Sequence, residues 1–127
     1  MPEEFRVLSD ENLHELAGPA TPGVTRRIAF ESDGYWFGCA EIAPHLMSGW
    51  HHHDRNVTVG YVLEGAFHLE HGPGGREHAD VKAGEYFLMP PWVIHREGRA
   101  TNEPCRMIFT RIGGGPPVVP VDGPEPD

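Results

Sequence analysis

Residues 49–65 read GWHHHDRNVTVGYVLEG, and residues 84–95 read GEYFLMPPWVIH. His51 and His53 are two residues apart, so on a β-strand their side chains point to the same face. His95 ends the second stretch and is a third histidine that the fold would have to bring to the pair. Three converging neutral imidazoles are typical of a site for a divalent transition metal with coordination positions left open. The two stretches therefore predict a metal site.

The composition indicates one β-rich domain. The chain has 127 residues, about the length of a single domain with one core, and it contains 16 glycines and 13 prolines. Short apolar runs separated by these turn-forming residues are typical of strands rather than of a helical bundle. The formal net charge of −9 argues against nucleic acid or an anionic membrane as a partner, because both need a basic patch.

Neither a leader peptide nor a membrane span is expected. The N-terminal residues lack the basic region and apolar core of a signal peptide, and no apolar run approaches the ~20 residues that cross a bilayer. Cys39 and Cys105 lie in apolar runs and are expected to be free thiols that pack as small hydrophobes. We therefore expect a cytoplasmic protein.

The turn signals predict an N-terminal segment over 1–23, a barrel over 24–112 and a C-terminal tail over 113–127. Ser9 or Asp10 is expected to cap a short helix over Glu11–Leu16, which Gly18-Pro19 would end. The tail is rich in proline and glycine and should cross the surface as an extended arm, frayed after Val121. The predicted strands are Val24–Glu31, Tyr35–Ile42, Met47–His53, Val57–Leu63, Ala66–His71, Glu77–Val81, Glu85–Met89, Val93–Arg96 and Cys105–Ile112. Their rhythm is typical of an all-β sandwich, jelly roll or small barrel.

The two opening stretches resemble the two sequence motifs of the cupins. Gly49–Gly65 is similar to the first motif and Gly84–His95 to the second, and together they cover about a third of the chain. The resemblance implies a jelly-roll barrel (a double-stranded β-helix) of six to eight strands, often a homodimer, with its metal inside. It also implies that the metal ligands are His51, His53 and His95.

Thr58 is the chief departure from the cupin pattern, because it stands where the family usually has a fourth, glutamate ligand. A site of three imidazoles without a carboxylate suits iron(II), zinc, copper, nickel or cobalt better than magnesium or calcium, and manganese stays open. The resemblance to three-histidine cupins favours iron(II) among these metals. Asp54 or Asn56 would replace the lost oxygen ligand only if a bulge turned it inward. The alternative is a cupin whose metal site no longer works.

Strand parity and position suggest roles for the neighbouring side chains. His52 is expected to point out of the barrel. Arg96 and Glu97 are expected to form an exposed ion pair, and the alternative is that they orient a polar group of a substrate or a metal ligand. Trp92 stands where the family commonly has glycine, so it either narrows the entrance or packs under a neighbouring loop or subunit. Trp50 is expected to face away from the metal. The candidate pocket walls are Val62, Tyr86, Leu88, Met89 and Phe109, and the histidines without a partner pattern are His14, His45, His68, His71 and His78.

The resemblance implies a function of the diketone-cleaving or thiol dioxygenase type, in which iron(II) binds a small substrate and dioxygen. In that interpretation Thr58 hydrogen-bonds a metal-bound water or oxygen species. The alternative enzyme is a metal-dependent cyclase, isomerase or lyase, with His45, Tyr86 or Glu97 as candidate general bases. The third hypothesis is a sensory cupin that binds a small molecule without catalysis.

Overall fold

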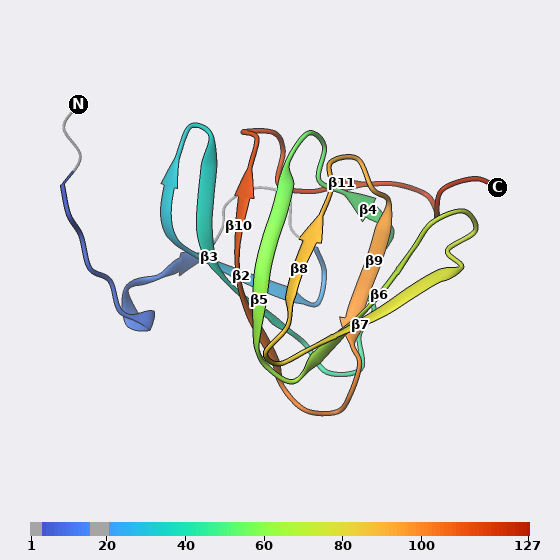
Figure 1. The fold of residues 1–127 in the computed structure, drawn as a ribbon, viewed down its shortest axis with the longest axis horizontal. Coiled ribbons are helices and arrows are strands. Elements are labelled where there is room, and N and C mark those ends of the chain that lie inside the picture. Colours follow the sequence, from blue (N-terminus) through green and yellow to red (C-terminus); the bar gives the residue numbers. More distant parts are fainter. Residues whose placement is uncertain (1–3, 16–20) are drawn as a thin grey trace.

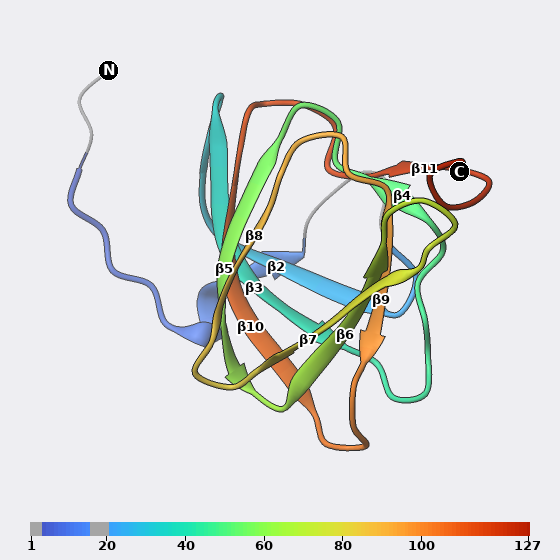
Figure 2. The ribbon, with the colours of Figure 1, turned by 45° about the vertical axis from the view of Figure 1, so that its right-hand side comes forward.

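The computed structural model describes residues 4–15 and 21–127, and these residues form two antiparallel sheets around a shared interior (Figures 1 and 2). One sheet has the strand order β1-β2-β3-β10-β5-β8 and the other β11-β4-β9-β6-β7. The strands are β1 (His14–Glu15), β2 (Val24–Ser32), β3 (Tyr35–Ile42), β4 (His51–His52), β5 (Val57–Glu64), β6 (Ala66–His71), β7 (Glu77–Lys82), β8 (Tyr86–Met89), β9 (His95–Arg99), β10 (Cys105–Ile112) and β11 (Val119–Pro120). The arrangement confirms the predicted all-β jelly roll. Within the described residues, no helix is long and apolar enough to cross a membrane.

Tight turns determine where each strand reverses. The Asp33-Gly34 turn joins β2 to β3, so that Ser32 pairs directly with Tyr35. Gly65 separates β5 from β6 and has a φ of +67°. A side chain there would begin 2.2 Å from the Pro104 carbonyl oxygen, so glycine is required both by conformation and by the close approach of another segment.

The interior is filled by alternate residues of strands from both sheets. Along β10, Cys105, Met107 and Phe109 are buried, and they pack with Val62 of β5 and Phe67 of β6. Fully burying side chains of this size contributes about 1.5–3 kcal/mol each, so this cluster accounts for much of the stability of the fold. The same alternation continues to position 111 and places a charged residue, Arg111, inside the barrel.

The predicted N-terminal helix is wrong. The structure has a single 3-10 turn, η1 (Asp10–Asn12), in which Ser9 and Asn12 hydrogen-bond each other; the chain is extended again from Leu13. β1 then pairs with β2, and this strand pairing replaces the expected second helical turn. The end of the predicted helix and its Gly18-Pro19 stop lie outside the described residues.

Two strands next to the site differ from their predicted bounds. The predicted strand Met47–His53 is reduced to β4, because Met47, at its start, forms an isolated bridge to Gly98 outside the named strands. Asp54, with a φ of +56°, turns the chain directly after His53. The strand predicted over Val93–Arg96 begins at His95 and continues to Arg99.

The C-terminal arm is extended, as expected, but it is also paired to the barrel. β11 pairs with β4, and the Val121 amide donates to the Trp50 carbonyl. Beyond Val121, where fraying was expected, Glu125 accepts a hydrogen bond from the Gly74 amide. The arm therefore adds an edge strand beside the strand that carries His51.

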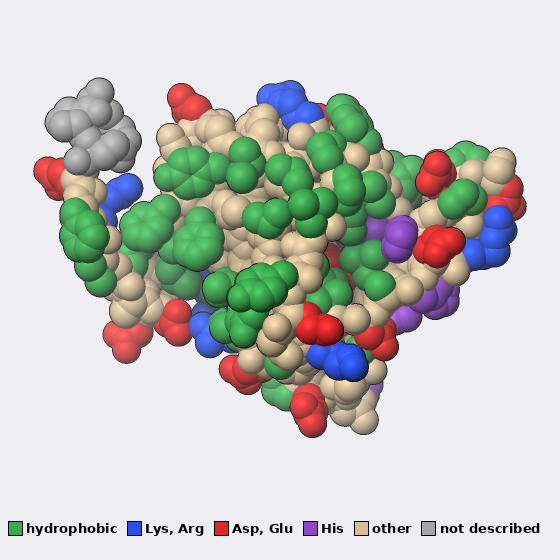
Figure 3. Space-filling model, viewed as in Figure 1, with side chains coloured by type: hydrophobic (Ala, Val, Ile, Leu, Met, Phe, Trp, Pro, Cys, Tyr) green, Lys and Arg blue, Asp and Glu red, His purple; other side chains and the backbone are tan. Residues whose placement is uncertain are grey.

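An apolar surface covers the outer face of the six-stranded sheet (Figure 3). Tyr86 and Leu88 on β8 are 81% and 61% exposed, and Phe37 on β3 lies in the same open groove. These side chains point away from the barrel interior.

Candidate metal centre

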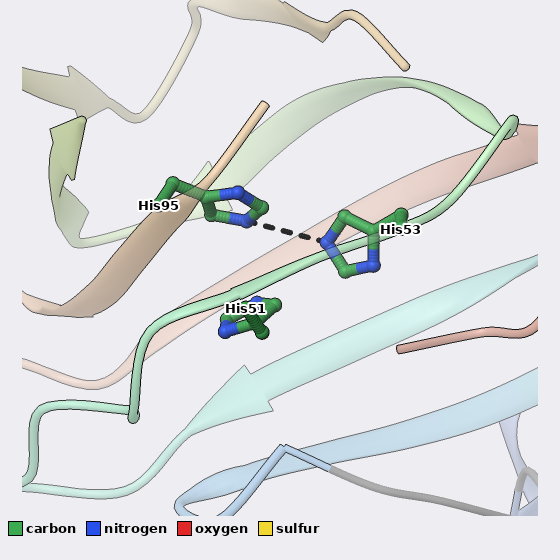
Figure 4. A group of neighbouring side chains, drawn as sticks. All are labelled: His51, His53 and His95. Carbon is green, nitrogen blue, oxygen red and sulfur yellow. Dashed lines mark hydrogen bonds between the residues drawn. The ribbon is translucent and has the colours of Figure 1, made fainter. Parts of the chain in front are cut away.

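The three predicted histidines meet inside the barrel. His51 on β4 pairs directly with His95 on β9, and His53 directly follows β4. Their exposed fractions are only 3% (His51), 4% (His53) and 1% (His95). Figure 4 shows the rings turned toward one another, and one ring nitrogen from each lies within 4.8 Å of the others. The pairing of β4 with β9 therefore assembles the cluster.

Backbone carbonyls determine which nitrogen of each ring faces the other rings. Each Nδ1–H donates to a main-chain oxygen, at 2.8 Å (His51 to Gly49), 2.7 Å (His53 to Pro117) and 2.9 Å (His95 to Val93). A carbonyl oxygen only accepts, so Nδ1 must carry the hydrogen. Each neutral ring then presents the lone pair of Nε2 to the cluster.

The three Nε2 atoms are thus acceptors placed together without a donor. Nε2 of His53 and Nε2 of His95 lie 3.2 Å apart (dashed line in Figure 4). Nε2 of His51 is buried and makes no hydrogen bond to any described residue. Buried lone pairs that face one another are unfavourable unless a cation lies between them. The cluster therefore fits a divalent metal held by three imidazoles, with the carbonyls on Nδ1 orienting the rings.

Burial keeps the three imidazoles neutral. Desolvation lowers the pKa of His53, and the positive charge of Arg111 lowers it further. Desolvation also lowers the pKa of His51, and it lowers the pKa of His95 to about 4, although Glu97 opposes both shifts. At neutral pH the rings therefore need not lose a proton before a cation can bind.

Thr58 lies in the cavity wall as the partner of a buried arginine. Its Oγ1 accepts a hydrogen bond of 2.8 Å from Nε of Arg111, whose Nη1 donates to the Pro117 carbonyl at 3.0 Å. The same carbonyl accepts the Nδ1–H of His53, so the network reaches a candidate ligand. Burial lowers the pKa of Arg111 to about 9, which leaves the guanidinium charged at neutral pH. Where the cupin pattern has a glutamate, this chain has a hydroxyl engaged with a cation.

Glu97 also faces the cavity, so the predicted exposed ion pair between Arg96 and Glu97 is wrong. Residues 95 and 97 share one face of β9 and Arg96 has the other, where it pairs with Glu70. Oε1 of Glu97 lies 3.9 Å from Nε2 of His51, and the glutamate side chain is 18% exposed. A carboxylate thus lies beside the cluster, supplied by β9 instead of by position 58.

Arg26 on β2 is a further charged residue of the cavity wall that the sequence did not single out. The sequence could have indicated this position, because side chains alternate along a strand and Arg26 therefore shares the buried face of β2 with Ile28. For Arg111 the signal was the alternation of apolar residues along β10. In both strands the charged residue occupies an inward position.

The remaining residues near the motifs lie outside the cavity wall. Asp54 is turned away, and its carboxylate accepts a hydrogen bond from the Arg55 amide. Asn56 is buried, but its amide donates to the carbonyls of His53 and Pro116 and so fixes the loop beneath the cluster. Neither replaces the missing oxygen ligand in the described structure.

The two tryptophans and His52 lie around the outside of the site. Trp92 is 59% exposed and packs beside His52, with ring centroids 5.5 Å apart, as expected for an outward His52. The φ of Trp92 is +67°, which explains why a glycine suits this position. Trp50 faces away from the cluster and stacks with Arg96, 4.6 Å from its ring.

The pocket-wall candidates divide in two. Met89 and Phe109 line the cavity, whereas Val62 belongs to the packed core. Tyr86 alternates outward on β8, so its predicted place in the wall is wrong. Leu88 also faces outward and does not line the cavity beside the histidines, but it borders a second pocket at the β7–β8 side. His45, the candidate from the preceding loop, is exposed and does not line the cavity.

The cavity beside the histidines is small. Its volume is about 40 Å³, above the roughly 10–15 Å³ that a cavity needs to hold one water. A second, apolar pocket of about 290 Å³ lies at the β7–β8 side of the barrel. The two share the walls Phe67, Leu69, Phe87 and Met89. The side chains that the two spaces share form the wall between them.

Residues 38–111, more than half of the chain, match the family model of the cupin domain. The chain belongs to the cupin family. None of the curated protein sequences matches it. Its fold is similar to those of three solved structures described below, each less than 25% identical to this chain, and such a likeness establishes the fold alone.

Three solved structures illustrate the range of this similarity. The polyketide cyclase RemF from Streptomyces resistomycificus is 21% identical, with a TM-score of 0.76, over 94% of this chain and 87% of that one. A conserved protein with a double-stranded β-helix domain from Klebsiella pneumoniae is 19% identical, with a TM-score of 0.71, over 93% of both chains. An oxalate oxidase is 23% identical, with a TM-score of 0.62, over 87% of this chain and 66% of that one.

Proposed function

We propose that this cupin is a metal-dependent oxidoreductase of the dioxygenase type that acts on a small organic molecule. The observation that carries the proposal is the convergence of three buried Nε2 lone pairs, each oriented by a carbonyl on Nδ1. The all-imidazole donor set with open positions suits transition metals better than hard cations, and we propose iron(II) among them because it supports the oxygen chemistry of the proposed reaction. When bound, it supplies a Lewis acid and the electrons that oxygen chemistry requires.

The charge of the cavity wall supports a substrate that reacts as an anion. Nη2 of Arg111 makes no hydrogen bond to any other described residue, and Arg111 lines the cavity. A guanidinium there holds an enolate, catecholate or thiolate oxygen or sulfur by a charge-assisted hydrogen bond. Thr58 and Pro117 fix the orientation of this guanidinium, and the apolar walls keep bulk water away. Diketones, catechol-like compounds and thiols all form such anions.

One observation favours a second candidate, a cyclase, isomerase or lyase that uses the metal without oxygen. The Glu97 carboxylate faces the reacting space and can accept a substrate proton at Oε1. The fold similarity to a polyketide cyclase agrees with this candidate but does not distinguish it from the first. If neither reaction is found, the third candidate function is that of a sensory cupin, which binds a small molecule without converting it.

The first experiment tests the metal. Protein purified without an affinity tag is analysed for bound metal, in the wild type and in the single variants His51→Gln, His53→Gln and His95→Gln. Each variant is expected to lose at least 90% of the cavity-bound metal, because each removes one of three ligands. His52→Gln is the matched control, since His52 lies in the same stretch but points outward. Unchanged metal content in all three ligand variants would refute the metal site.

The second experiment distinguishes the reactions. Iron-loaded protein is mixed with 1,3-diketones, catechols, flavonols and thiols while oxygen uptake is recorded. Uptake that depends on substrate and is lost in His95→Gln supports the dioxygenase. Substrate conversion under strict exclusion of oxygen, lost in Glu97→Gln, supports the cyclase, isomerase or lyase instead. Binding without conversion in either condition supports the sensory role.

A further inference from the structure

A second cluster of metal-ligand side chains lies on the outer face of the β6–β7 hairpin. His68 and Glu70 are two residues apart on β6, and His78 and Asp80 are two residues apart on β7, so each pair shares one face. The register places His68 directly opposite Asp80 and Glu70 directly opposite His78. The sequence offered no partner pattern for these histidines, because their partners belong to another strand.

His68 is held with one nitrogen directed into this cluster. Its Nδ1 lies 2.6 Å from Oδ1 of Asp80, and its Nε2 lies 3.1 Å from Oε2 of Glu70. In the metal-free chain both ring nitrogens donate, Nδ1–H to Asp80 and Nε2–H to Glu70, and these hydrogen bonds raise the pKa of His68. A metal ion would replace the proton on Nε2, while the Nδ1–H bond to Asp80 would remain, the usual arrangement behind a zinc-bound histidine. Asp80 therefore orients His68 in the same way that carbonyls orient the three histidines of the cavity.

Glu70 is held in the same manner by an arginine. Nε and Nη2 of Arg96 lie 2.8 and 2.7 Å from Oε1 of Glu70, which leaves Oε2 for the cluster. Arg96 is itself stacked on Trp50. The Glu70 side chain is only 14% exposed, so the carboxylate is fixed rather than freely rotating in solvent.

We propose that His68, Glu70 and His78 form a second metal site, separate from the cavity, that takes zinc or a similar borderline divalent ion. Their ligand atoms lie within 4.8 Å of one another. Zinc bonds of about 2.0–2.1 Å require ligand atoms roughly 3.3 Å apart in a tetrahedron. His68 and Glu70 already satisfy this separation, and His78, which is exposed, has room to move toward them.

The donor set and the position decide which ion fits. Two imidazoles and one carboxylate oxygen suit zinc, whereas calcium and magnesium prefer oxygen ligands throughout. The site faces solvent on the hairpin, so water completes the coordination. Since it uses none of the three cavity histidines, this site does not depend on the proposed enzymatic function.

Zinc binding to the untagged, metal-free full chain tests the proposal. Competition with a chromogenic zinc chelator is expected to give two zinc ions per chain in the wild type and one in the double variant His68→Gln/His78→Gln. The matched control is His14→Gln/His52→Gln, which removes two histidines outside either cluster and should keep both ions. Equal stoichiometry in the wild type and the His68→Gln/His78→Gln variant would overturn the proposal.

Two further measurements protect this test against a folding defect. In the wild type, the imidazole nitrogen NMR signals of His68 and His78 should shift on addition of zinc, separately from the signals of the cavity histidines. If the signals of His68 and His78 stay unchanged after zinc has filled the cavity site, the proposed second site is overturned. Asp80→Asn, which weakens the orientation of His68 but removes no ligand, should reduce zinc affinity about 10-fold or more. An unchanged affinity in Asp80→Asn would show that Asp80 does not support a ligand.

Discussion

Mild acid should destabilise the metal-free protein through its buried histidines. The pKa of His95 is about 4 in the folded chain, against the ordinary 6.5 that the unfolded chain regains. Between these values the unfolded state binds more protons than the folded state, so stability falls as the pH falls. His51 and His53, whose pKa values are also lowered, act in the same direction.

The size of the effect follows from the two pKa values of His95. At about pH 5 the unfolded histidine is almost fully protonated and the folded one is mostly neutral, which costs the folded state about 2 kcal/mol. This is a large part of a typical stability of about 5–15 kcal/mol. The loss of stability that His95 causes begins near pH 6.5 and is complete below about pH 4.

The assay is urea unfolding of chelator-treated protein, followed by tryptophan fluorescence at several pH values between about 7 and 4.5. His95→Gln should show a shallower fall of stability with acid, since it removes one of the three titrating groups. His52→Gln, whose ring lies outside the barrel, should keep the wild-type slope. If His95→Gln and the wild type lose the same free energy between about pH 7 and 5, the buried neutral state assigned to His95 is wrong.

Three other substitutions test the cavity, the core and the apolar outer face. Thr58→Glu places a carboxylate beside Arg111 and the histidines and should tighten manganese or iron binding, measured by competition with a metal-sensitive dye; weaker binding would mean that position 58 does not reach the metal. Phe67→Ala removes a core ring and should cost about 3–5 kcal/mol in urea unfolding, whereas a cost below about 1 kcal/mol would contradict its packed position. Leu88→Glu puts a charge into the exposed apolar groove, and if this face joins two copies in a homodimer, light scattering should show a shift from dimer to monomer; an unchanged mass would exclude this face as the dimer interface.

The strand order along the chain was predictable because its signals are local. Three predicted strands, Tyr35–Ile42, Ala66–His71 and Cys105–Ile112, have the observed bounds, since turn residues flank alternating apolar runs. The predicted N-terminal helix was wrong for a tertiary reason. The capping residues favour a first helical turn, but the residues that follow are extended because they pair with β2.

The sequence by itself determined which side chains share a face of a strand. The spacing of His51 and His53 required them to point the same way, and the resemblance to cupins added His95 as their partner. The same parity was available for Glu97 and Arg111, whose inward positions follow from the side-chain period of two. This alternation along one strand does not predict which residues of other strands face these side chains.

Only the tertiary structure decided which strands face one another. The register of β6 against β7 brings His78 to Glu70, and the two-sheet packing brings Arg111 to Thr58 and Glu97 to His51. These contacts join residues far apart in the chain, and their geometry depends on strand order and register. Local residue preferences do not encode either, because strand pairing is settled by the burial of all the apolar faces at once.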